Sequence, residues 1–94
     1  MEKFTVTSII DGDTFEVSPH WIWQGQTGNR VRSAGYDAPE VFQFGGASVT
    51  DKLARLILHT QVELGTAHRV DRGRLVCEVY FQGRNFADYF RQYR

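Results

Sequence analysis

The sequence predicts a small, mainly β domain of the α+β class, with five short strands closed into a barrel and two helices packed on it. Three observations support this. Apolar and polar residues alternate along several short segments, turn residues separate these segments, and one segment repeats apolar residues at helical spacing. The 94 residues leave room for one hydrophobic core, so a single domain over residues 1–94 is expected.

The N-terminal half predicts three strands. Residues 4–10 and 14–17 alternate, and Asp11-Gly12 between them is a strong hairpin signal. Residues 30–36 form the third predicted strand, which ends shortly before a proline, because proline cannot donate to a strand ladder. The polar, glycine-containing stretch 18–29 is longer than this connection usually needs.

The C-terminal half predicts two helices and two strands. Apolar residues at i, i+4, i+7 and i+8 predict a helix over residues 47–59. Residues 60–64 and 75–81 are the remaining strands, and Asn85 can cap a last helix that runs to about residue 93. A five-stranded barrel of the oligonucleotide-binding (OB) type is the simplest closure of these elements, because closing the sheet removes its edges.

Composition narrows the function classes. The formal net charge is zero, which argues mildly against strong non-specific binding of nucleic acid. Most of the eleven basic residues are arginines, whose planar fork matches phosphate or carboxylate oxygens. No apolar run approaches the ~18 residues that cross a bilayer, so no membrane partner is expected. Cys77, the one cysteine, lies in an apolar run and is expected in the core.

The N-terminus moves directly into strand pattern without the apolar stretch of a signal peptide. As written, the chain therefore predicts a cytoplasmic protein. A leader removed from the chain would instead allow secretion.

Two short acidic turns are the strongest candidates for a functional site. Asp11 and Asp13 flank a glycine after the first strand, and Asp37 and Glu40 flank an Ala-Pro pair after the third. Four carboxylates that faced each other would repel unless a cation bound among them, and hard oxygen ligands favour Ca²⁺ or Mg²⁺. Each turn alone is also ordinary turn chemistry.

Two arginines strengthen this interpretation. Arg32 lies on the strand that leads to Asp37, and Arg74 precedes the strand at residues 75–81. Phosphoryl transfer needs positive charge fixed around the phosphorus, which arginine forks and a metal ion supply. It also needs a carboxylate that positions or deprotonates water.

Three segments in order, 9–14, 31–40 and 71–75, resemble the motifs of the staphylococcal nuclease (thermonuclease) family. The resemblance covers nearly the whole chain and implies an OB barrel that cleaves DNA and RNA with Ca²⁺. The expected substrate is single-stranded DNA or RNA, and the expected state is a monomer. It implies that Asp13, Asp37 and the backbone carbonyl of Ala38 hold Ca²⁺, with Asp11 just outside the metal shell. Glu40 would activate the attacking water, and Arg32 and Arg74 would clamp the phosphate.

The sequence departs from the family in two places. The tyrosine that usually precedes the glycine of the third motif, here Gly73, is missing, which puts substrate affinity in doubt. The chain also stops at Arg94, whereas relatives commonly continue, so a C-terminally short member is expected.

Trp21 and Trp23 are two residues apart in the long stretch 18–29 and would share one face of an extended segment. They are candidates for stacking on single-stranded bases. The alternative is that they cover one end of the barrel. For the protein as a whole, the alternative to a nuclease is a non-catalytic module of the same fold that binds nucleic acid or a protein partner.

Overall fold

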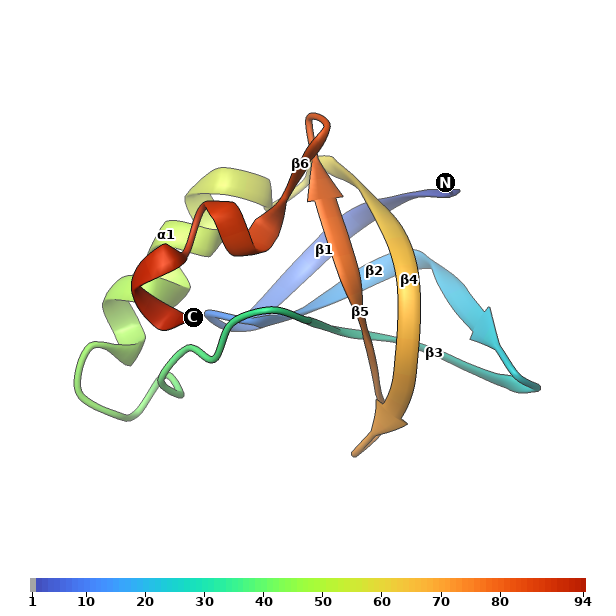
Figure 1. Cartoon of the computed structure of the whole chain (residues 1–94), viewed down its shortest axis with the longest axis horizontal. Helices are drawn as coiled ribbons and strands as arrows, with labels where there is room; N and C mark the ends of the chain where they lie inside the picture. The colour runs from blue at the N-terminus through green and yellow to red at the C-terminus, as the bar shows by residue number, and fades with distance from the viewer. Residues whose placement is uncertain (1) are drawn as a thin grey trace.

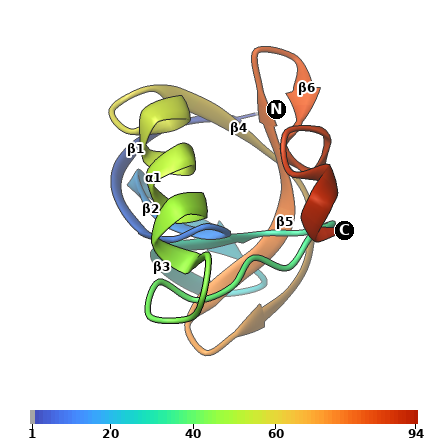
Figure 2. The ribbon, with the colours of Figure 1, turned by 90° about the vertical axis from the view of Figure 1, so that its left-hand side faces the viewer.

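The computed structural model describes residues 2–94 and forms a closed barrel of five strands (Figure 1). Its strands, in chain order, are β1 (Glu2–Asp11), β2 (Thr14–Trp23), β3 (Gln26–Ser33), β4 (Gln61–Asp71) and β5 (Arg74–Phe81). Helix α1 (Gly46–Ile57) joins β3 to β4 and lies across one end of the barrel (Figure 2). No helix formed by residues 2–94 is long and apolar enough to cross a membrane.

The barrel closes through one parallel pair of strands. Antiparallel pairing links β3 to β2, β2 to β1, β1 to β4 and β4 to β5. Strands β3 and β5 then pair in parallel, from Arg30 beside Arg74 to Ser33 beside Cys77. The prediction of a mainly β, barrel-like fold is therefore confirmed.

Apolar side chains fill the barrel and the space under α1. Strands contribute Val6, Phe15 and Val31, all 0% exposed, and the apolar stripe of α1 adds Leu53 and Ile57, also 0% exposed. The helix forms where its apolar spacing predicted it, because one face of it closes this core. Cys77 is a buried core residue, as expected, and burial raises the pKa of its thiol to about 12.

The predicted second helix is absent from the described residues. Residues 84–93 instead form strand β6 (Arg84–Asn85) and two single-turn 3₁₀ helices, η1 (Phe86–Asp88) and η2 (Arg91–Tyr93). Asn85 does cap η1, since its Oδ1 accepts from Ala87 N at 2.9 Å. The break comes at Phe90, whose backbone is not helical and whose ring is fully buried, so tertiary packing overrides the helical propensity here.

The polar stretch 18–29, expected to be a loop, extends β2 and β3 into a long hairpin. Trp21 pairs with Gly28 and Trp23 with Gln26. The two tip residues, Gln24 and Gly25, have φ of 49° and 77°, as a tight hairpin turn of the primed type requires. Strand β4 likewise continues beyond its predicted end at residue 64 to Asp71. Its second half is held in strand conformation by pairing with β5, and the local sequence pattern does not predict this.

A polar network joins β4, β5 and the C-terminal segment. Glu78 contacts His68 Nε2 through Oε2 at 2.8 Å and accepts from Asn85 Nδ2 through Oε1 at 2.9 Å. The hydrogen bond to His68 lowers the pKa of Glu78, burial opposes this in part, and the hydrogen bond to Asn85 lowers the pKa further. Because Asn85 also caps η1, this carboxylate helps to anchor the C-terminal segment.

The substitution Glu78→Gln should lower the free energy of unfolding near pH 7 by about 1–2 kcal/mol, since hydrogen bonds to a charged group usually contribute about 1.5–3 kcal/mol and partial exposure of this side chain reduces that. The native pKa of Glu78 lies below its ordinary value of 4.5, so its stabilisation is fully present above pH 4.5 and is lost as the pH falls through the native pKa. Urea unfolding of both proteins between pH 3 and 7 measures this. A stability difference that stays constant over this range would contradict the assignment.

Candidate functional site

The two acidic turns meet at the end of the barrel that α1 covers. Tyr36 Oη donates to the carbonyl of Gly12 at 2.9 Å, and Ser33 N donates to the carbonyl of Asp13 at 2.9 Å. The ring of Tyr36 stacks on Phe90 with centroids 4.8 Å apart, which fixes the hydroxyl in position. The end of β3 is therefore bound directly to the turn between β1 and β2.

Gly12 permits this approach because it has no side chain. A Cβ at this position would lie 2.7 Å from Val49 Cγ1 on α1 and 2.8 Å from Ala38 Cβ, both well inside van der Waals contact. The requirement is for space, since the backbone of Gly12 is not among those with positive φ.

One polar cavity of about 240 Å³ collects every residue that the sequence predicted for metal and phosphate binding. Arg72 and Gln43 line it as well, and the sequence did not single them out. The residues that line the cavity are Asp11, Asp13, Arg32, Asp37, Ala38, Glu40, Gln43, Arg72 and Arg74.

Asp13 is the buried carboxylate of this cavity, with 5% of the residue exposed. Its Oδ1 accepts from Thr14 Oγ1 at 3.1 Å and its Oδ2 accepts from Ala38 N at 3.2 Å. Burial raises the pKa of Asp13, and the neighbouring Asp11 raises it further, while the Ala38 N–H and the Arg32 guanidinium partly offset this. Asp11 also accepts from Asp13 N at 3.3 Å, so it supports the turn from one side.

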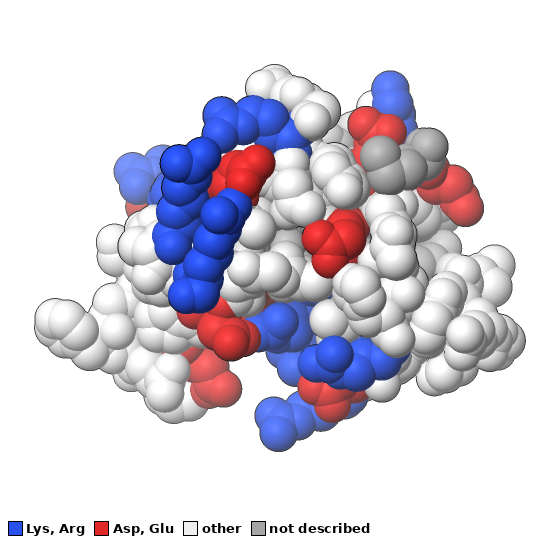
Figure 3. All heavy atoms as spheres, viewed as in Figure 1, with Lys and Arg blue, Asp and Glu red and all other residues white. Residues whose placement is uncertain are grey.

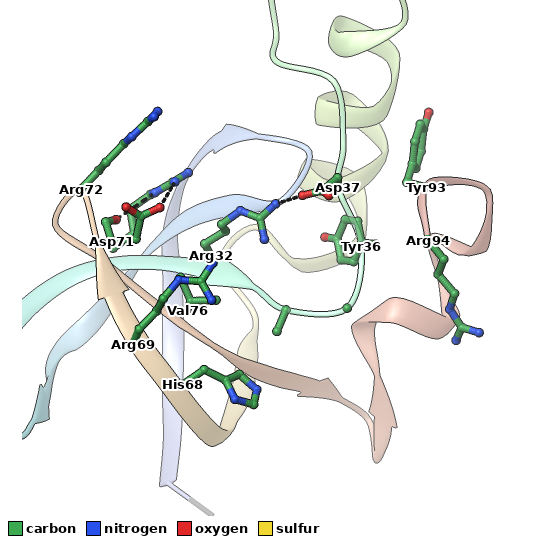
Figure 4. A pocket seen from close by; sticks show the side chains of 13 residues that line it. Arg32, Tyr36, Asp37, His68, Arg69, Asp71, Arg72, Val76, Tyr93 and Arg94 are labelled. Carbon is green, nitrogen blue, oxygen red and sulfur yellow. Dashed lines mark hydrogen bonds and ion pairs between the residues drawn. The ribbon is translucent and has the colours of Figure 1, made fainter.

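Arg32 joins the two acidic turns electrostatically. Its Nη2 lies 3.3 Å from Asp13 Oδ2 and is also paired with Asp37 Oδ1 (Figure 4). The side chain of Arg32 is 18% exposed, whereas that of Asp37 is 88% exposed and faces solvent. A single guanidinium thus balances one buried and one exposed carboxylate.

Arg74, at the start of β5, also lines the cavity. Its Nη1 donates to Thr14 Oγ1 at 3.2 Å and its Nη2 lies 3.4 Å from Asp71 Oδ2. The turn before it has φ of 54° at Arg72 and 77° at Gly73, which makes a tight connection between β4 and β5. Thr14 therefore links the two halves of the site, since it bonds both Asp13 and Arg74.

Asp13 and Asp37 are the candidate carboxylate ligands for a hard divalent cation. Among residues 2–94, no group of three or more His, Cys, Asp or Glu side chains converges on one point. The pair Asp13 and Asp37 shares one cationic partner, and burial makes the charge of Asp13 unfavourable without such a partner. A cation that takes two carboxylates and completes its shell with main-chain or water oxygens suits these donors.

Glu40 is an exposed residue that lines the cavity, and hydrogen bonds of its backbone close the loop on which it lies. Glu40 N donates to Gln43 Oε1 at 2.8 Å, and Gln43 N donates back to the Glu40 carbonyl at 2.8 Å. These two hydrogen bonds fix the backbone of Glu40, and its exposed side chain lines the same cavity as Asp37.

A second, larger cavity of about 570 Å³ shares Arg32, Asp37, Arg72 and Arg74 with the first. Figure 4 shows Arg69 beneath Arg32, and Tyr93 and Arg94 on the other side of the cavity. Arg72 lies within the third motif, residues 71–75, and could have been anticipated. Tyr93 and Arg94 reach the site only through the fold of the C-terminal segment, in which the Tyr93 carbonyl accepts from Asp37 N at 2.9 Å.

The surface charge is mixed rather than uniformly basic. On the face shown in Figure 3, arginine and lysine side chains lie interspersed with acidic ones, and both ends of the long axis are uncharged. The larger cavity, which is lined by five arginines and two aspartates, is a local concentration of positive charge in a neutral molecule.

Trp21 does not serve as a stacking platform. It is only 3% exposed, and its indole N–H donates to the Arg30 carbonyl at 2.8 Å. Trp23 is half-buried and packs against the core. Both lie on the hairpin that projects away from α1 in Figure 1, so they cover the far end of the barrel, which was the alternative interpretation.

Close packing around Gly12 gives a test of this geometry. The substitution Gly12→Ala should lower the free energy of unfolding by about 1–3 kcal/mol, because the new methyl group overlaps Val49 and Ala38. Adding Val49→Ala removes one of the two clashes, so the double variant should lose less stability than the sum of the single variants. Urea unfolding of all four proteins measures the coupling, and strict additivity would contradict the packing.

The chain matches no model of a known protein family and no curated protein sequence. A function for it therefore depends on the fold and on the chemistry of the two cavities.

Proposed function

We propose that the protein is a nuclease of the staphylococcal nuclease type, which hydrolyses phosphodiester bonds in single-stranded DNA or RNA with a divalent cation, Ca²⁺ by resemblance. One observation carries the proposal. Four carboxylates and three arginines from separate segments of the chain line a single polar cavity.

The barrel supports this function. We assign it to the OB type, because its strands follow the cyclic order β1-β2-β3-β5-β4 with α1 between β3 and β4. OB domains bind oligonucleotides on the face of strands 2 and 3 and with the loops that join strands 1 to 2 and 4 to 5. Here those two loops hold Asp13 and Arg72.

In the proposed reaction, Asp13, Asp37 and the Ala38 carbonyl hold the cation, which would supply positive charge next to the scissile phosphate. The Glu40 carboxylate accepts a proton from the attacking water, whose oxygen forms a bond to phosphorus. The bond from phosphorus to the 5′-oxygen breaks, and that oxygen takes a proton from solvent, which leaves a 3′-phosphate and a 5′-hydroxyl.

Arg32 and Arg74 donate hydrogen bonds to the non-bridging phosphate oxygens and stabilise the charge that develops on them. Both side chains are about four-fifths buried and hydrogen-bonded, at 18% and 20% exposure, so their orientation is largely fixed before substrate binds. Positive charge beside Asp13 and Asp37 would also weaken the hold of these carboxylates on Arg32, which would release its guanidinium toward phosphate.

The rival function is a binding module that holds nucleic acid without cutting it. One observation favours it, namely that Arg32 is already paired with both carboxylates, so that the opposite charges of the site neutralise each other. Such a module would bind phosphate through Arg69, Arg72 and Arg94 in the larger cavity instead.

Cleavage of a 5′-labelled single-stranded oligonucleotide distinguishes the two. The nuclease should cut in Ca²⁺ and stop in chelator. Arg32→Ala and Arg74→Ala should each lower the cleavage rate by about 10²–10³-fold, and Glu40→Gln by about 10²–10⁴-fold. Denaturing gel electrophoresis measures these rates.

Arg55→Ala is the matched arginine control, since Arg55 is exposed on α1 and paired with Asp51, and Glu63→Gln on β4 is the matched glutamate control. Both should cut at the parental rate. Cutting that persists in chelator, or that survives all three site substitutions, refutes the proposal. Binding of the oligonucleotide without any cutting supports the module instead.

A further inference from the structure

Exposed apolar side chains concentrate in one loop beside the polar cavity. Among the described residues, four large hydrophobic side chains are exposed, and three of them are Val41, Phe42 and Phe44. Phe42 is 81% exposed and Phe44 is 104% exposed, which is full exposure for a large ring. This loop, residues 41–45, is called the aromatic loop below.

The aromatic loop is folded tightly onto Glu40. Gln43 exchanges two hydrogen bonds with Glu40, both of 2.8 Å, and its carbonyl accepts from Gly46 N at 2.8 Å. Gly46 is required for this turn, since a Cβ there would lie 1.7 Å from the Glu40 carbonyl oxygen. Hydrogen bonds within the loop therefore stabilise its conformation, and its two phenylalanine rings are not buried.

Gln43 lines the polar cavity, and the phenylalanines on either side of it do not. The rings therefore stand at the edge of a site that carries the cationic groups, on the same loop as the water-activating carboxylate. In the view shared by Figures 1 and 3, the end of the molecule that holds this loop is uncharged. A ligand with an anionic part for the cavity and a flat apolar part for the rim would match both surfaces.

We propose that Phe42 and Phe44 form a stacking platform for unpaired bases next to the phosphate held by Arg32 and Arg74. Single-stranded nucleic acid has this composition, with an anionic phosphate beside a planar base that stacks on aromatic rings regardless of sequence. A duplex hides these faces between base pairs, so the platform selects single strands. The inference rests on the proposed function, because it takes the cavity as the phosphate site.

Binding of two labelled dodecamers, one of thymidine nucleotides and one of abasic sugar-phosphates of equal length, tests the platform. Fluorescence anisotropy in Ca²⁺ is measured in a Glu40→Gln background, which keeps the strands intact. The background protein should bind the thymidine strand at least about tenfold more tightly than the abasic one. Phe42→Ala/Phe44→Ala should remove this preference and leave the affinity for the abasic strand unchanged.

Two further variants sharpen the result. Phe42→Leu/Phe44→Leu keeps an apolar loop without flat rings and should also lose most of the preference. Ile22→Ala, which removes the other large exposed hydrophobic side chain, at 80% exposure on the far hairpin, should keep it.

The platform is overturned if the double alanine variant binds both strands like its background, or weakens both equally. If Arg32→Ala then abolishes binding, the phosphate site stands without the platform. If the background protein binds neither strand, the proposed function fails as well. A dimer in sedimentation that the double alanine variant converts to monomer, with unchanged affinity for DNA, would show that the aromatic loop contacts a second copy instead.

Discussion

Close packing at Gly12 is the constraint on which the site depends. Helix α1 approaches this glycine through Val49, the turn after β3 approaches it through Ala38, and its carbonyl accepts from Tyr36 Oη. Tyr36 in turn stacks on Phe90, and the Tyr93 carbonyl holds Asp37 N. The turn between β1 and β2, the turn after β3 and helix α1 therefore meet at one backbone position. This contact sets the separation between the two acidic turns.

A buried charge in the cavity is unfavourable for the stability of the fold. Asp13 is buried beside Asp11, which raises its pKa, and only Arg32 and a few polar groups offset this. A buried carboxylate near a second carboxylate is unfavourable in isolation, and such arrangements concentrate at functional sites. The molecule as a whole has zero net charge, and acidic and basic side chains are mixed on the face shown in Figure 3. The buried carboxylate Asp13 is therefore an exception to the general distribution of charge.

Sequence alone was sufficient for the parts of the structure that local patterns specify. The apolar stripe of α1 and the Asp11-Gly12 hairpin followed from spacing and turn chemistry. The acidic turns and the resemblance of three segments to a nuclease family together singled out the carboxylates and arginines that line one cavity. The long β2–β3 hairpin could not be predicted in this way, because its residues form strands through pairing with each other. The C-terminal segment could not either, since Phe90 is drawn into the core and breaks the helix that its neighbours favour. Tyr93 and Arg94 entered the site for the same reason, whereas Gln43 entered it through the turn that its two hydrogen bonds with Glu40 close.

Burial of Cys77 has a practical consequence for spectroscopy. Its thiol is enclosed in the barrel with a pKa of about 12, so at neutral pH it is neither accessible nor nucleophilic. A cysteine introduced at Ile22, which is exposed on β2 and lines neither of the two cavities, would be the reactive thiol. A maleimide dye placed there would report on tumbling and ligand capture without any need to mutate the core.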